Sequence, residues 1–293
     1  MPRARATEWR YTALVLAFPL HFPVAGKGKG PKCGFFRFMA RYDFRSPRLY
    51  VAAPLGAGLT VTLDAAQIRY LVSVLRMAPG DSVLVFNGAD GEWKARLTAV
   101  AKRNTVLLVE ANTRPQPEPG NLNYLFSPLK RARLDYMVQK AVEMGVSRLH
   151  PVIMRHTQAE RVNLDRMRAN AIEAAEQCGI LAIPQIAAPL DFAAALAALD
   201  PSCHLVFCDE DAPCGDPVAA LRADLGLDLG AHANSAELAV LVGPEGGFAE
   251  EERATLLRRP RTSRLALGPR ILRADTAAVA ALAVVQTAAG DWR

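Results

Sequence analysis

The spacing of apolar and polar residues changes near residue 120 and divides the chain into two regions. Between residues 47 and 117, short segments alternate apolar and polar side chains, which is the period of half-buried strands. Turn-forming residues separate these segments at Ala78–Asp81 and Asn87–Gly91, and one longer segment, Ala65–Arg76, with Asp64 as N-cap, predicts a helix. The pattern predicts a small β-rich domain over residues 47–117, a barrel. Its expected strands are Arg48–Val51, Ser82–Phe86, Glu92–Ala99 and Thr105–Glu110.

Beyond the proline-rich linker Arg114–Gly120, strand-like apolar runs alternate with helical segments up to the end of the chain. Such alternation is typical of a parallel sheet covered by helices, so residues 121–293 predict one α/β domain. We expect strands at Asn123–Ser127, Arg148–Ile153, His204–Cys208, Glu237–Val242 and Ser263–Leu267. We expect helices at Arg131–Met144, which Gly145 ends, and at Leu164–Cys178, Phe192–Leu199, Pro217–Leu225, Glu250–Arg258 and Thr276–Ala289.

Composition places the chain among ordinary globular proteins, with 51% apolar and 22% charged residues. No apolar run reaches the roughly 18 residues of a membrane span, so we expect no membrane partner. The formal charge of +6 comes from residues 1–46, which hold nine Lys/Arg and two Asp/Glu and contribute +7. The remaining residues have a net charge of −1. The basic pI is therefore no argument for nucleic acid binding by itself.

The five cysteines are too few and too irregularly spaced for a disulfide framework. Cys203, His204, Cys208 and Cys214 lie close in sequence and raise the alternative of a metal site, but no CxxC pair is present. We expect buried thiols, no metal and a reducing cytoplasmic location.

Residues 1–46 predict an N-terminal extension that is disordered or comes from an over-extended gene start. Three arginines precede the apolar stretch Tyr11–Leu20, which superficially resembles a signal peptide, whereas nothing later in the chain resembles a secreted protein. Met39 begins a more ordinary N-terminus, and we expect translation to start there. The intact mass of the native protein tests this expectation.

Two glycine-bearing loops near the C-terminus carry the clearest chemical signal. The first, Gly243–Phe248 (GPEGGF), follows an apolar strand and precedes a helix that begins with acidic residues. Its glycines let a backbone approach a ligand, and the helix after it offers free N–H groups. Its spacing matches neither a Walker A motif nor GxGxxG, so it gives no support for a nucleotide-phosphate loop. A plain glycine-rich turn is the alternative.

The second loop, Leu267–Thr276 (LGPRILRADT), also lies between a strand and a helix. We therefore expect both loops at the carboxyl ends of neighbouring parallel strands, where open α/β sheets bind ligands. Arg270, Arg273 and Asp275 bring charge to this edge of the sheet. Surface ion pairs of little energetic value are the alternative.

With both loops in place, the chain resembles the RsmE family, bacterial enzymes that methylate N3 of a uridine in 16S ribosomal RNA, position 1498 in standard rRNA numbering. The pair GPEGGF and LGPRILRADTA carries the resemblance, which extends through most of residues 47–290. The sequence departs from the family at Tyr70 (often His), at Ile180 (often Arg) and at residues 154–156 (often Ser-Glu-Arg), which bears on RNA contacts more than on the cofactor site. The further shared motifs are VLRMAPGD (Val74–Asp81), FNG (Phe86–Gly88), LDYMVQKAVEMGV (Leu134–Val146) and EAAEQCG (Glu173–Gly179).

The resemblance implies a SPOUT-class methyltransferase, in which the parallel sheet of the α/β domain carries a C-terminal trefoil knot and a small PUA-like β-barrel precedes it. It also implies S-adenosylmethionine as the cofactor, bound on the two loops, a homodimer that completes each active site, and 16S rRNA within the 30S subunit as the partner. Ribose 2′-O-methylation by another SPOUT enzyme and a non-catalytic RNA-binding assembly factor are the alternatives. The expected cofactor-binding residues are Leu241, Val242, Gly243, Pro244, Glu245, Gly246, Gly247, Leu267, Gly268, Pro269, Arg270, Ile271, Leu272 and Thr276.

Methylation of uridine N3 requires loss of its proton and stabilisation of charge on the neighbouring oxygens. Glu245 is the candidate proton acceptor, with an acceptor role for loop N–H groups as the alternative. Arg273 is the candidate for charge stabilisation, with a phosphate contact as the alternative. Asp275 either orients Arg273 or caps the last helix. The candidate phosphate contacts, each with a solvated surface charge as the alternative, are Arg48, Arg76, Lys130, Arg131 and Arg133.

Overall fold

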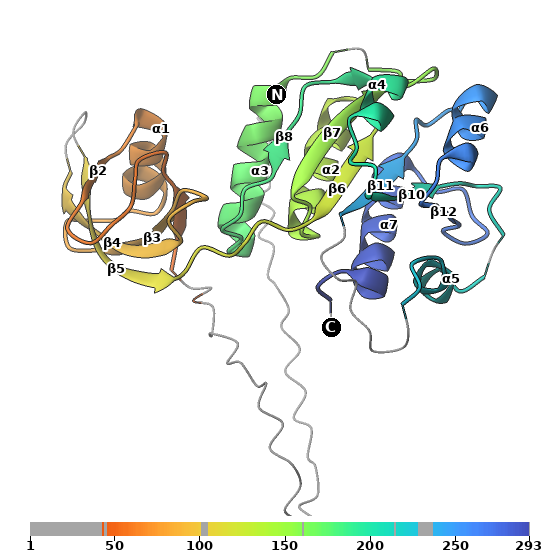
Figure 1. The fold of residues 1–293 in the computed structure, drawn as a ribbon. Coiled ribbons are helices and arrows are strands. Elements are labelled where there is room, and N and C mark those ends of the chain that lie inside the picture. Colours follow the sequence, from red (N-terminus) through yellow and green to blue (C-terminus); the bar gives the residue numbers. More distant parts are fainter. Residues whose placement is uncertain are drawn as a thin grey trace, which may run out of the picture. The chain divides into compact units, whose positions relative to one another are not determined.

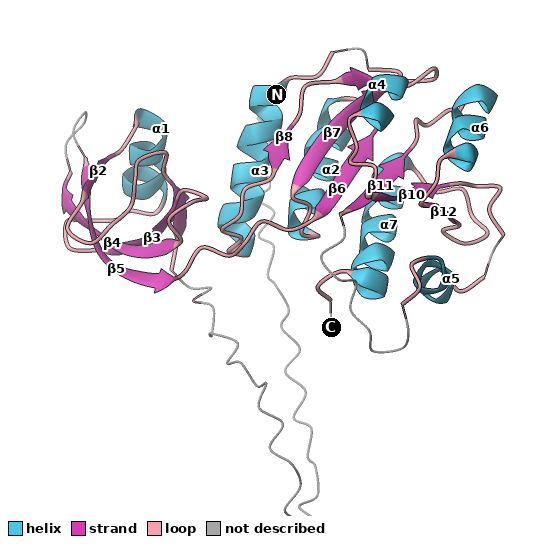
Figure 2. Cartoon of the chain, viewed as in Figure 1, coloured by secondary structure: helices cyan, strands magenta, loops and turns pink. Residues whose placement is uncertain are grey.

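The computed structural model describes residues 43, 46–100, 105–159, 161–213, 215–227 and 237–292. The N-terminal extension expected over residues 1–46, and the start expected at Met39, therefore lie almost entirely outside the described residues. The described residues form a small β-rich domain followed by a larger α/β domain (Figures 1 and 2).

The small domain is a five-stranded sheet with the strand order β1-β3-β4-β5-β2. β1 runs parallel to β3, and the other pairs are antiparallel. Register shifts between β4 and β5 curl the sheet around a core that includes Leu49, Val85 and Leu107. Among the described residues no ladder joins β1 to β2, so the predicted barrel is a curled but open sheet. The strands are β1 (Arg48–Tyr50), β2 (Thr60–Thr62), β3 (Ser82–Phe86), β4 (Glu92–Ala99) and β5 (Val106–Arg114).

The helix predicted at Ala65–Arg76 is correct at its start and wrong in its form. The carboxylate of Asp64 accepts the N–H groups of residues 66 and 67, so the N-cap prediction is confirmed. The α-helix α1 (Ala65–Ile68) then widens into the π-helix η1 (Arg69–Val74), and Arg76 follows with a φ of 57°. A pattern of apolar residues this short does not distinguish the two kinds of helix.

The α/β domain contains a seven-stranded sheet in which every pairing is parallel, as predicted. Its order is β12-β10-β11-β6-β7-β8, and β9 also pairs with β7. The strands are β6 (Leu122–Phe126), β7 (Arg148–Ile153), β8 (Gln185–Ile186), β9 (Leu190–Asp191), β10 (His204–Cys208), β11 (Leu238–Val242) and β12 (Thr262–Leu265). The helices are α2 (Arg131–Glu143), α3 (Leu164–Cys178), α4 (Phe192–Ala197), α5 (Pro217–Asp224), α6 (Glu250–Arg258) and α7 (Ala274–Ala289).

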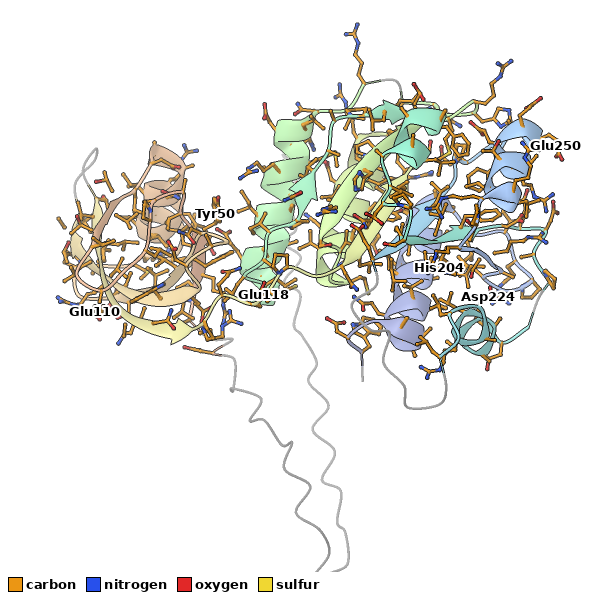
Figure 3. All side chains as sticks on the ribbon, in the orientation of Figure 1. Tyr50, Glu110, Glu118, His204, Asp224 and Glu250 are labelled. Carbon is orange, nitrogen blue, oxygen red and sulfur yellow. The ribbon has the colours of Figure 1, made fainter. Side chains whose placement is uncertain are left out.

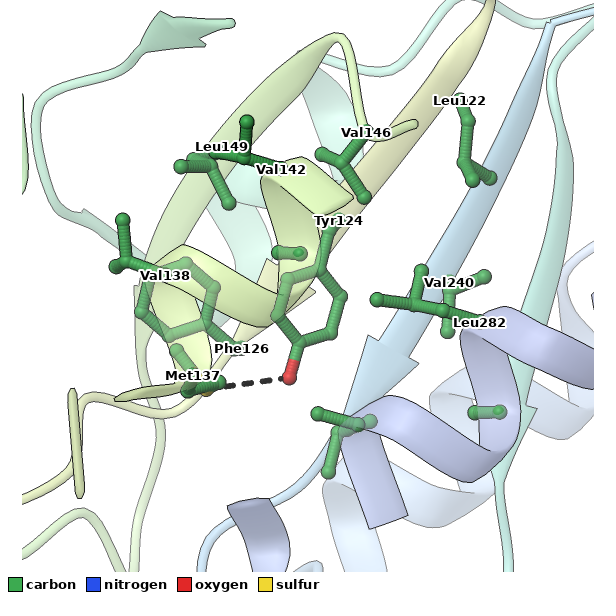
Figure 4. Close-up of a cluster of buried hydrophobic side chains, with 14 of the residues drawn as sticks. Leu122, Tyr124, Phe126, Met137, Val138, Val142, Val146, Leu149, Val240 and Leu282 are labelled. Atoms are coloured by element: carbon green, nitrogen blue, oxygen red, sulfur yellow. Dashed lines mark hydrogen bonds between the residues drawn. The ribbon is translucent and has the colours of Figure 1, made fainter. Parts of the chain in front are cut away.

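Helices cover both faces of this sheet, because successive residues of each strand point to opposite sides. Tyr124 of β6 and Val240 of β11 pack in the core that α2, α3, α5 and α7 cover. Leu125 and Leu241, the next residues of the same strands, pack in the core that α4 and α6 cover. Figure 4 shows the first core, where the Tyr124 hydroxyl donates a hydrogen bond to the Met137 sulfur over 3.3 Å.

The C-terminal helix α7 returns from the edge of the sheet to its middle. β12 is an edge strand, yet α7, which follows it, packs against α2, α5 and β11. The C-terminal knot that the resemblance implies remains a prediction.

The two domains are joined by hydrogen-bond and packing contacts as well as by the linker between them. The N–H of Tyr50 in β1 donates to a carboxylate oxygen of Glu176 in α3 over 2.8 Å. The rings of Tyr50 and Phe86 meet edge-on at 5.8 Å, and Phe86 belongs to the core of the α/β domain. The small domain therefore shares part of its packing with the sheet that carries the two loops.

Candidate active site

The first glycine loop, residues 243–248, leaves the end of β11 and is held in one shape by packing and hydrogen bonds. The N–H of Gly247 donates to the carbonyl three residues before it over 2.9 Å, and the φ of Gly247 is 75°. The ring of Phe248 lies against Gly243, where an added Cβ would come within 2.9 Å of a ring carbon. On the other side, Nδ1 of His156 lies 3.1 Å from the Gly247 carbonyl oxygen. Backbone conformation requires Gly247, and close packing requires Gly243.

The second loop, expected over Leu267–Thr276, spans residues 266–273 in the structure. It connects β12 to α7 and is turned by Gly268, which has a φ of 92°. α7 begins at Ala274 with Arg273 as its N-cap, two residues before the predicted start at Thr276. The Ile271 side chain is 91% exposed. An apolar side chain of this size in the open is available to a ligand or to another molecule.

The strands that lead into the two loops are not neighbours, so that expectation was wrong. β10 lies between β11 and β12, and its carboxyl end brings a third segment, residues 208–211 (CDED), between the loops. The buried carboxylate of Asp209 accepts hydrogen bonds from Arg253 of α6 and Arg264 of β12. Burial alone would raise the pKa of Asp209, but these hydrogen bonds outweigh it and lower the pKa. An acidic run directly after a predicted strand is the sequence signal for this segment.

The three segments enclose a hollow of about 340 Å³, here called the acidic hollow. Its size lies within the roughly 300–1,000 Å³ of typical ligand pockets. Glu250, the first residue of α6 and labelled there in Figure 3, is also among the residues that line the hollow. Among the lining residues that the structure describes, five are acidic and two basic, and such a lining favours a cationic ligand. The acidic residues are Asp209, Glu210, Asp211, Glu245 and Glu250, and the basic residues are Arg253 and Arg270.

A second hollow, here called the basic hollow, lies beside the first. It is lined by the start of α2, the segment before α3 with its first turn, and the end of the second loop. Lys130, the N-cap of α2, makes no side-chain capping bond, so the N–H groups of the first turn add to the positive potential. Of the lining residues within the described ranges, the basic ones are Lys130, Arg131, Arg133, Arg161, Arg166 and Arg273, and the acidic ones are Asp135, Asp165 and Glu245.

Glu245, Ile271, Leu272 and Ala274 line both hollows. The Glu245 carboxylate accepts a hydrogen bond from Nη1 of Arg133 over 2.9 Å, so an ion pair connects the first loop to α2 at this boundary. Ligands in the two hollows would meet at these four residues.

Most residues expected to bind the cofactor line the acidic hollow, but Leu241, Gly246 and Thr276 do not. Leu241 is fully buried in the core beneath, so its side chain cannot contact a ligand in the hollow as expected. An added Cβ at Gly246 would lie 3.2 Å from the His156 side chain, and Thr276 is exposed on α7. The expected residues that do line the hollow are Val242, Gly243, Pro244, Glu245, Gly247, Leu267, Gly268, Pro269, Arg270, Ile271 and Leu272.

The two residues expected to act in catalysis both reach the boundary region. Glu245 lines both hollows and Arg273 lines the basic one. Nε of Arg273 lies 3.8 Å from a carboxylate oxygen of Asp275, and the same oxygen accepts the N–H of Thr276 over 3.0 Å. The Asp275 carboxylate therefore contacts both Arg273, which it could orient, and an N–H group in the first turn of α7, which it could cap.

Arg48 is not a phosphate contact, and this expectation was wrong. Its side chain is 3% exposed, and its Nε donates to a carboxylate oxygen of Glu92 over 2.9 Å. Arg114 bonds to the same carboxylate from its other side. Burial of a cation is costly unless it is paired, so this cluster is a structural element of the small domain.

The other four expected phosphate contacts are exposed. Lys130, Arg131 and Arg133 line the basic hollow together, whereas Arg76 follows η1 in the small domain. The sequence did not identify Arg161 and Arg166, which come from the segment before α3 and from its first turn.

Of the cysteines that the structure describes, Cys203 is buried and Cys208 half-buried, whereas Cys178 at the end of α3 is exposed, contrary to the expected buried thiols. Burial raises the pKa of Cys208 to about 12 and that of Cys203 to about 11, so both thiols stay protonated at neutral pH. Within the described ranges, which leave out Cys214, no group of three or more His, Cys, Asp or Glu could hold a metal ion. Within those same ranges no helix has the length and apolar character to cross a bilayer.

Comparison with protein families gives the class of protein that carries this parallel sheet and its strand-end loops, an RNA methyltransferase. A family model described as RNA methyltransferase domain matches residues 116–286, and one described as RNA methyltransferase PUA domain matches residues 63–110. The predicted fold class, a SPOUT-type α/β domain after a PUA-like domain, is confirmed.

Relatives and a solved structure identify the family within this class. The protein named ribosomal RNA small subunit methyltransferase E from Rickettsia conorii is 26% identical to this chain, and the match covers 82% of this chain and 94% of that protein. The protein of the same name from a Synechocystis species is 30% identical, and the match covers 81% of this chain and 76% of that protein. The crystal structure of the protein of that name from Neisseria gonorrhoeae, bound to S-adenosyl methionine, matches with a TM-score of 0.70 at 29% identity and covers 85% of this chain and all of that one. The chain belongs to the family of ribosomal RNA small subunit methyltransferase E, which its motifs predicted.

Proposed function

We propose that this protein transfers a methyl group from S-adenosylmethionine to N3 of a uridine in 16S rRNA during maturation of the small ribosomal subunit. The names of its relatives and the cofactor bound to the Neisseria gonorrhoeae structure support the reaction class. The observation that carries the proposal is the meeting of an acidic hollow and a basic hollow at Glu245, Ile271, Leu272 and Ala274. A cationic methyl donor and an anionic RNA would meet there.

The acidic hollow suits this cofactor in its charge and in the groups that line it. S-adenosylmethionine carries a sulfonium and an ammonium against one carboxylate, and five acidic side chains line the hollow. Leu267, Ile271 and Leu272 offer apolar surface to an adenine ring, and the glycine loops offer backbone groups that can hydrogen-bond to its edge. When bound, the cofactor supplies an electrophilic methyl group on sulfur. The protein therefore needs to align the reacting groups and exclude water from them rather than to activate the methyl group.

Glu245 and Arg273 are the residues that we propose for the chemistry of uridine. A uridine entering from the basic hollow would bring its N3–H to the boundary, where the Glu245 carboxylate can accept the proton directly or through water. Arg273, on the basic side, can stabilise negative charge that develops on the two uracil oxygens.

Lys130 and Arg131 are the proposed contacts to the phosphates beside the target nucleotide, because both line the basic hollow. We also propose that the protein acts in the cytoplasm on an RNA within the 30S subunit, and that it forms a homodimer. The 91% exposed Ile271 is an apolar surface that a second copy could cover.

Nucleoside analysis of rRNA from a strain lacking the gene tests the proposal most directly. We expect N3-methyluridine to disappear from 16S rRNA and to return with the gene, and not with a variant that carries Glu245→Gln. A missing 2′-O-methylnucleoside would instead indicate a ribose methyltransferase. Failure of the purified protein to bind S-adenosylmethionine in a calorimetric titration would indicate a non-catalytic RNA-binding factor.

A further inference from the structure

We propose that Arg133 is a positioning residue for methyl transfer: it connects the Glu245 carboxylate on one side to an RNA phosphate on the other. Arg133 belongs to the first turn of α2 and Glu245 to the first glycine loop, 112 residues further along the chain. Nη1 of Arg133 lies 2.9 Å from Oε1 of Glu245. The inference rests on the proposed function, because it assigns Glu245 the task of accepting the N3 proton.

The ion pair contributes little to the stability of the fold. The Arg133 side chain is 45% exposed and that of Glu245 26% exposed. Exposed pairs of this kind are worth about 0–1 kcal/mol. The ion pair is better explained by the position in which it holds the Glu245 carboxylate. Glu245 is one of the four described residues that line both hollows.

The remaining donors of Arg133 point to a second anionic partner. A guanidinium has five N–H donors in a planar fork, and the described residues bond to its side chain only through Nη1. Arg133 lines the basic hollow with Lys130 and Arg131, at a helix start that carries no acidic residue. A helix N-terminus of this kind favours an anion, and the fork suits a phosphate. Arg133 can therefore hold both partners at once.

In the proposed chemical step, Glu245, uridine N3 and the sulfur of the cofactor account for the proton and for both electron pairs that move. The proton leaves N3 for a Glu245 oxygen, and the electron pair on N3 forms the new bond to the methyl carbon. The bond between sulfur and that carbon breaks, and its electrons stay on sulfur as a neutral thioether. Because the guanidinium fixes the carboxylate relative to the RNA backbone, loss of Arg133 should misplace the proton acceptor even when RNA is bound.

A second ion pair in the same hollow provides the matched control. Arg166 bonds to both carboxylate oxygens of Asp135, at 2.8 and 2.6 Å. Both residues line the basic hollow, but neither lines the acidic one. Arg166 can therefore contact RNA without reaching the proton acceptor.

The test is a double-mutant cycle of Arg133→Ala and Glu245→Gln with 30S subunits as substrate, with kcat and KM measured separately and the affinity for S-adenosylmethionine measured by calorimetry. We expect Arg133→Ala to lower kcat about 10- to 100-fold and to raise KM. In the Glu245→Gln background it should raise KM without lowering kcat further. Arg133→Lys should recover part of kcat, and Arg166→Ala should change KM alone.

Three results would overturn the inference: equal losses of kcat in both backgrounds, an effect of Arg133→Ala on KM alone, or an equal loss of kcat in Arg166→Ala. A wild-type protein that binds the cofactor but methylates no uridine would overturn the proposed function first and the inference with it. Unchanged cofactor affinity in Arg133→Ala and Arg166→Ala, whose residues line the basic hollow alone, shows that the acidic hollow is intact and that the differences arise on the RNA side.

Discussion

Gly243→Ala should damage cofactor binding through one side chain, the ring of Phe248. A Cβ at residue 243 would lie 2.9, 3.0 and 3.2 Å from three carbons of that ring. The ring cannot simply move away, because it meets Phe207 edge-on at 5.8 Å and packs in the core beneath the loop. The loop must therefore change shape, and residues 243–245, 247 and 248 form part of the wall of the acidic hollow.

The cost follows from the packing. Forcing an extra methyl group into a filled space costs about 1–3 kcal/mol. If the free loop relaxes to avoid the contact, binding must restore the original shape, and the cost appears in the affinity. Since each 1.4 kcal/mol is a factor of ten, the Kd for S-adenosylmethionine should rise about 5- to 150-fold.

Calorimetric titration of the variant with S-adenosylmethionine measures this effect, and two further variants control it. Adding Phe248→Leu to Gly243→Ala makes room for the new methyl group and should restore much of the affinity. Gly215→Ala, where an added Cβ meets no atom within 4 Å, should bind like the wild type. A Gly243→Ala protein with unchanged Kd, or one that Phe248→Leu fails to improve, would refute this explanation of the loop.

Three other substitutions test the remaining interpretations. Arg273→Ala should leave cofactor affinity unchanged and slow single-turnover methylation about 100-fold or more, and unchanged turnover would remove Arg273 from the mechanism. Glu92→Gln should lower the free energy of unfolding by about 3–5 kcal/mol near neutral pH, since it leaves Arg48 and Arg114 without their carboxylate. Burial would raise the pKa of Glu92, but the hydrogen bonds from these arginines outweigh it and lower the pKa below the ordinary 4.5. The stabilisation is thus present above pH 4.5 and lost as the pH falls through the lower, folded-state value, so denaturant curves of the two proteins should converge in acid. Asp64→Ala should cost about 1 kcal/mol by the same measurement, and no change would mean that its capping bonds contribute nothing.

The two glycine loops could be predicted because their signals are local. A glycine with a φ of 75° or 92° follows a strand in each case, and the helix that comes next begins within a few residues. Strand order is not local, and this is why β10 was not expected between β11 and β12. For the same reason Asp209 was not identified from the sequence. Its carboxylate is held by hydrogen bonds from Arg253 and Arg264, which lie 44 and 55 positions away in the chain.

Arg48 shows the limit of assigning roles to charged residues one at a time. Its sequence context, near the start of a strand in a basic stretch, does not reveal that Glu92 and Arg114 enclose it. By contrast, Lys130, Arg131 and Arg133 could be grouped from the sequence because they are consecutive or nearly so at a helix start. What the sequence could not supply is the carboxylate of Glu245 that meets one of them.

The division of charge between the two hollows gives a physical reason why, in the proposed reaction, their ligands would meet at one place. The acidic side chains come from the end of β10, the first glycine loop and the start of α6, while most of the basic ones come from the start of α2 and the start of α3. RNA is repelled from the first set and the cationic donor from the second. Among the described residues, only Glu245 and residues 271, 272 and 274 line both hollows. At these residues the RNA can approach the cofactor without entering the acidic hollow, and the cofactor can approach the RNA without entering the basic hollow. A mutation that changes the charge at this boundary should therefore disturb the transfer of the methyl group more than the binding of either ligand.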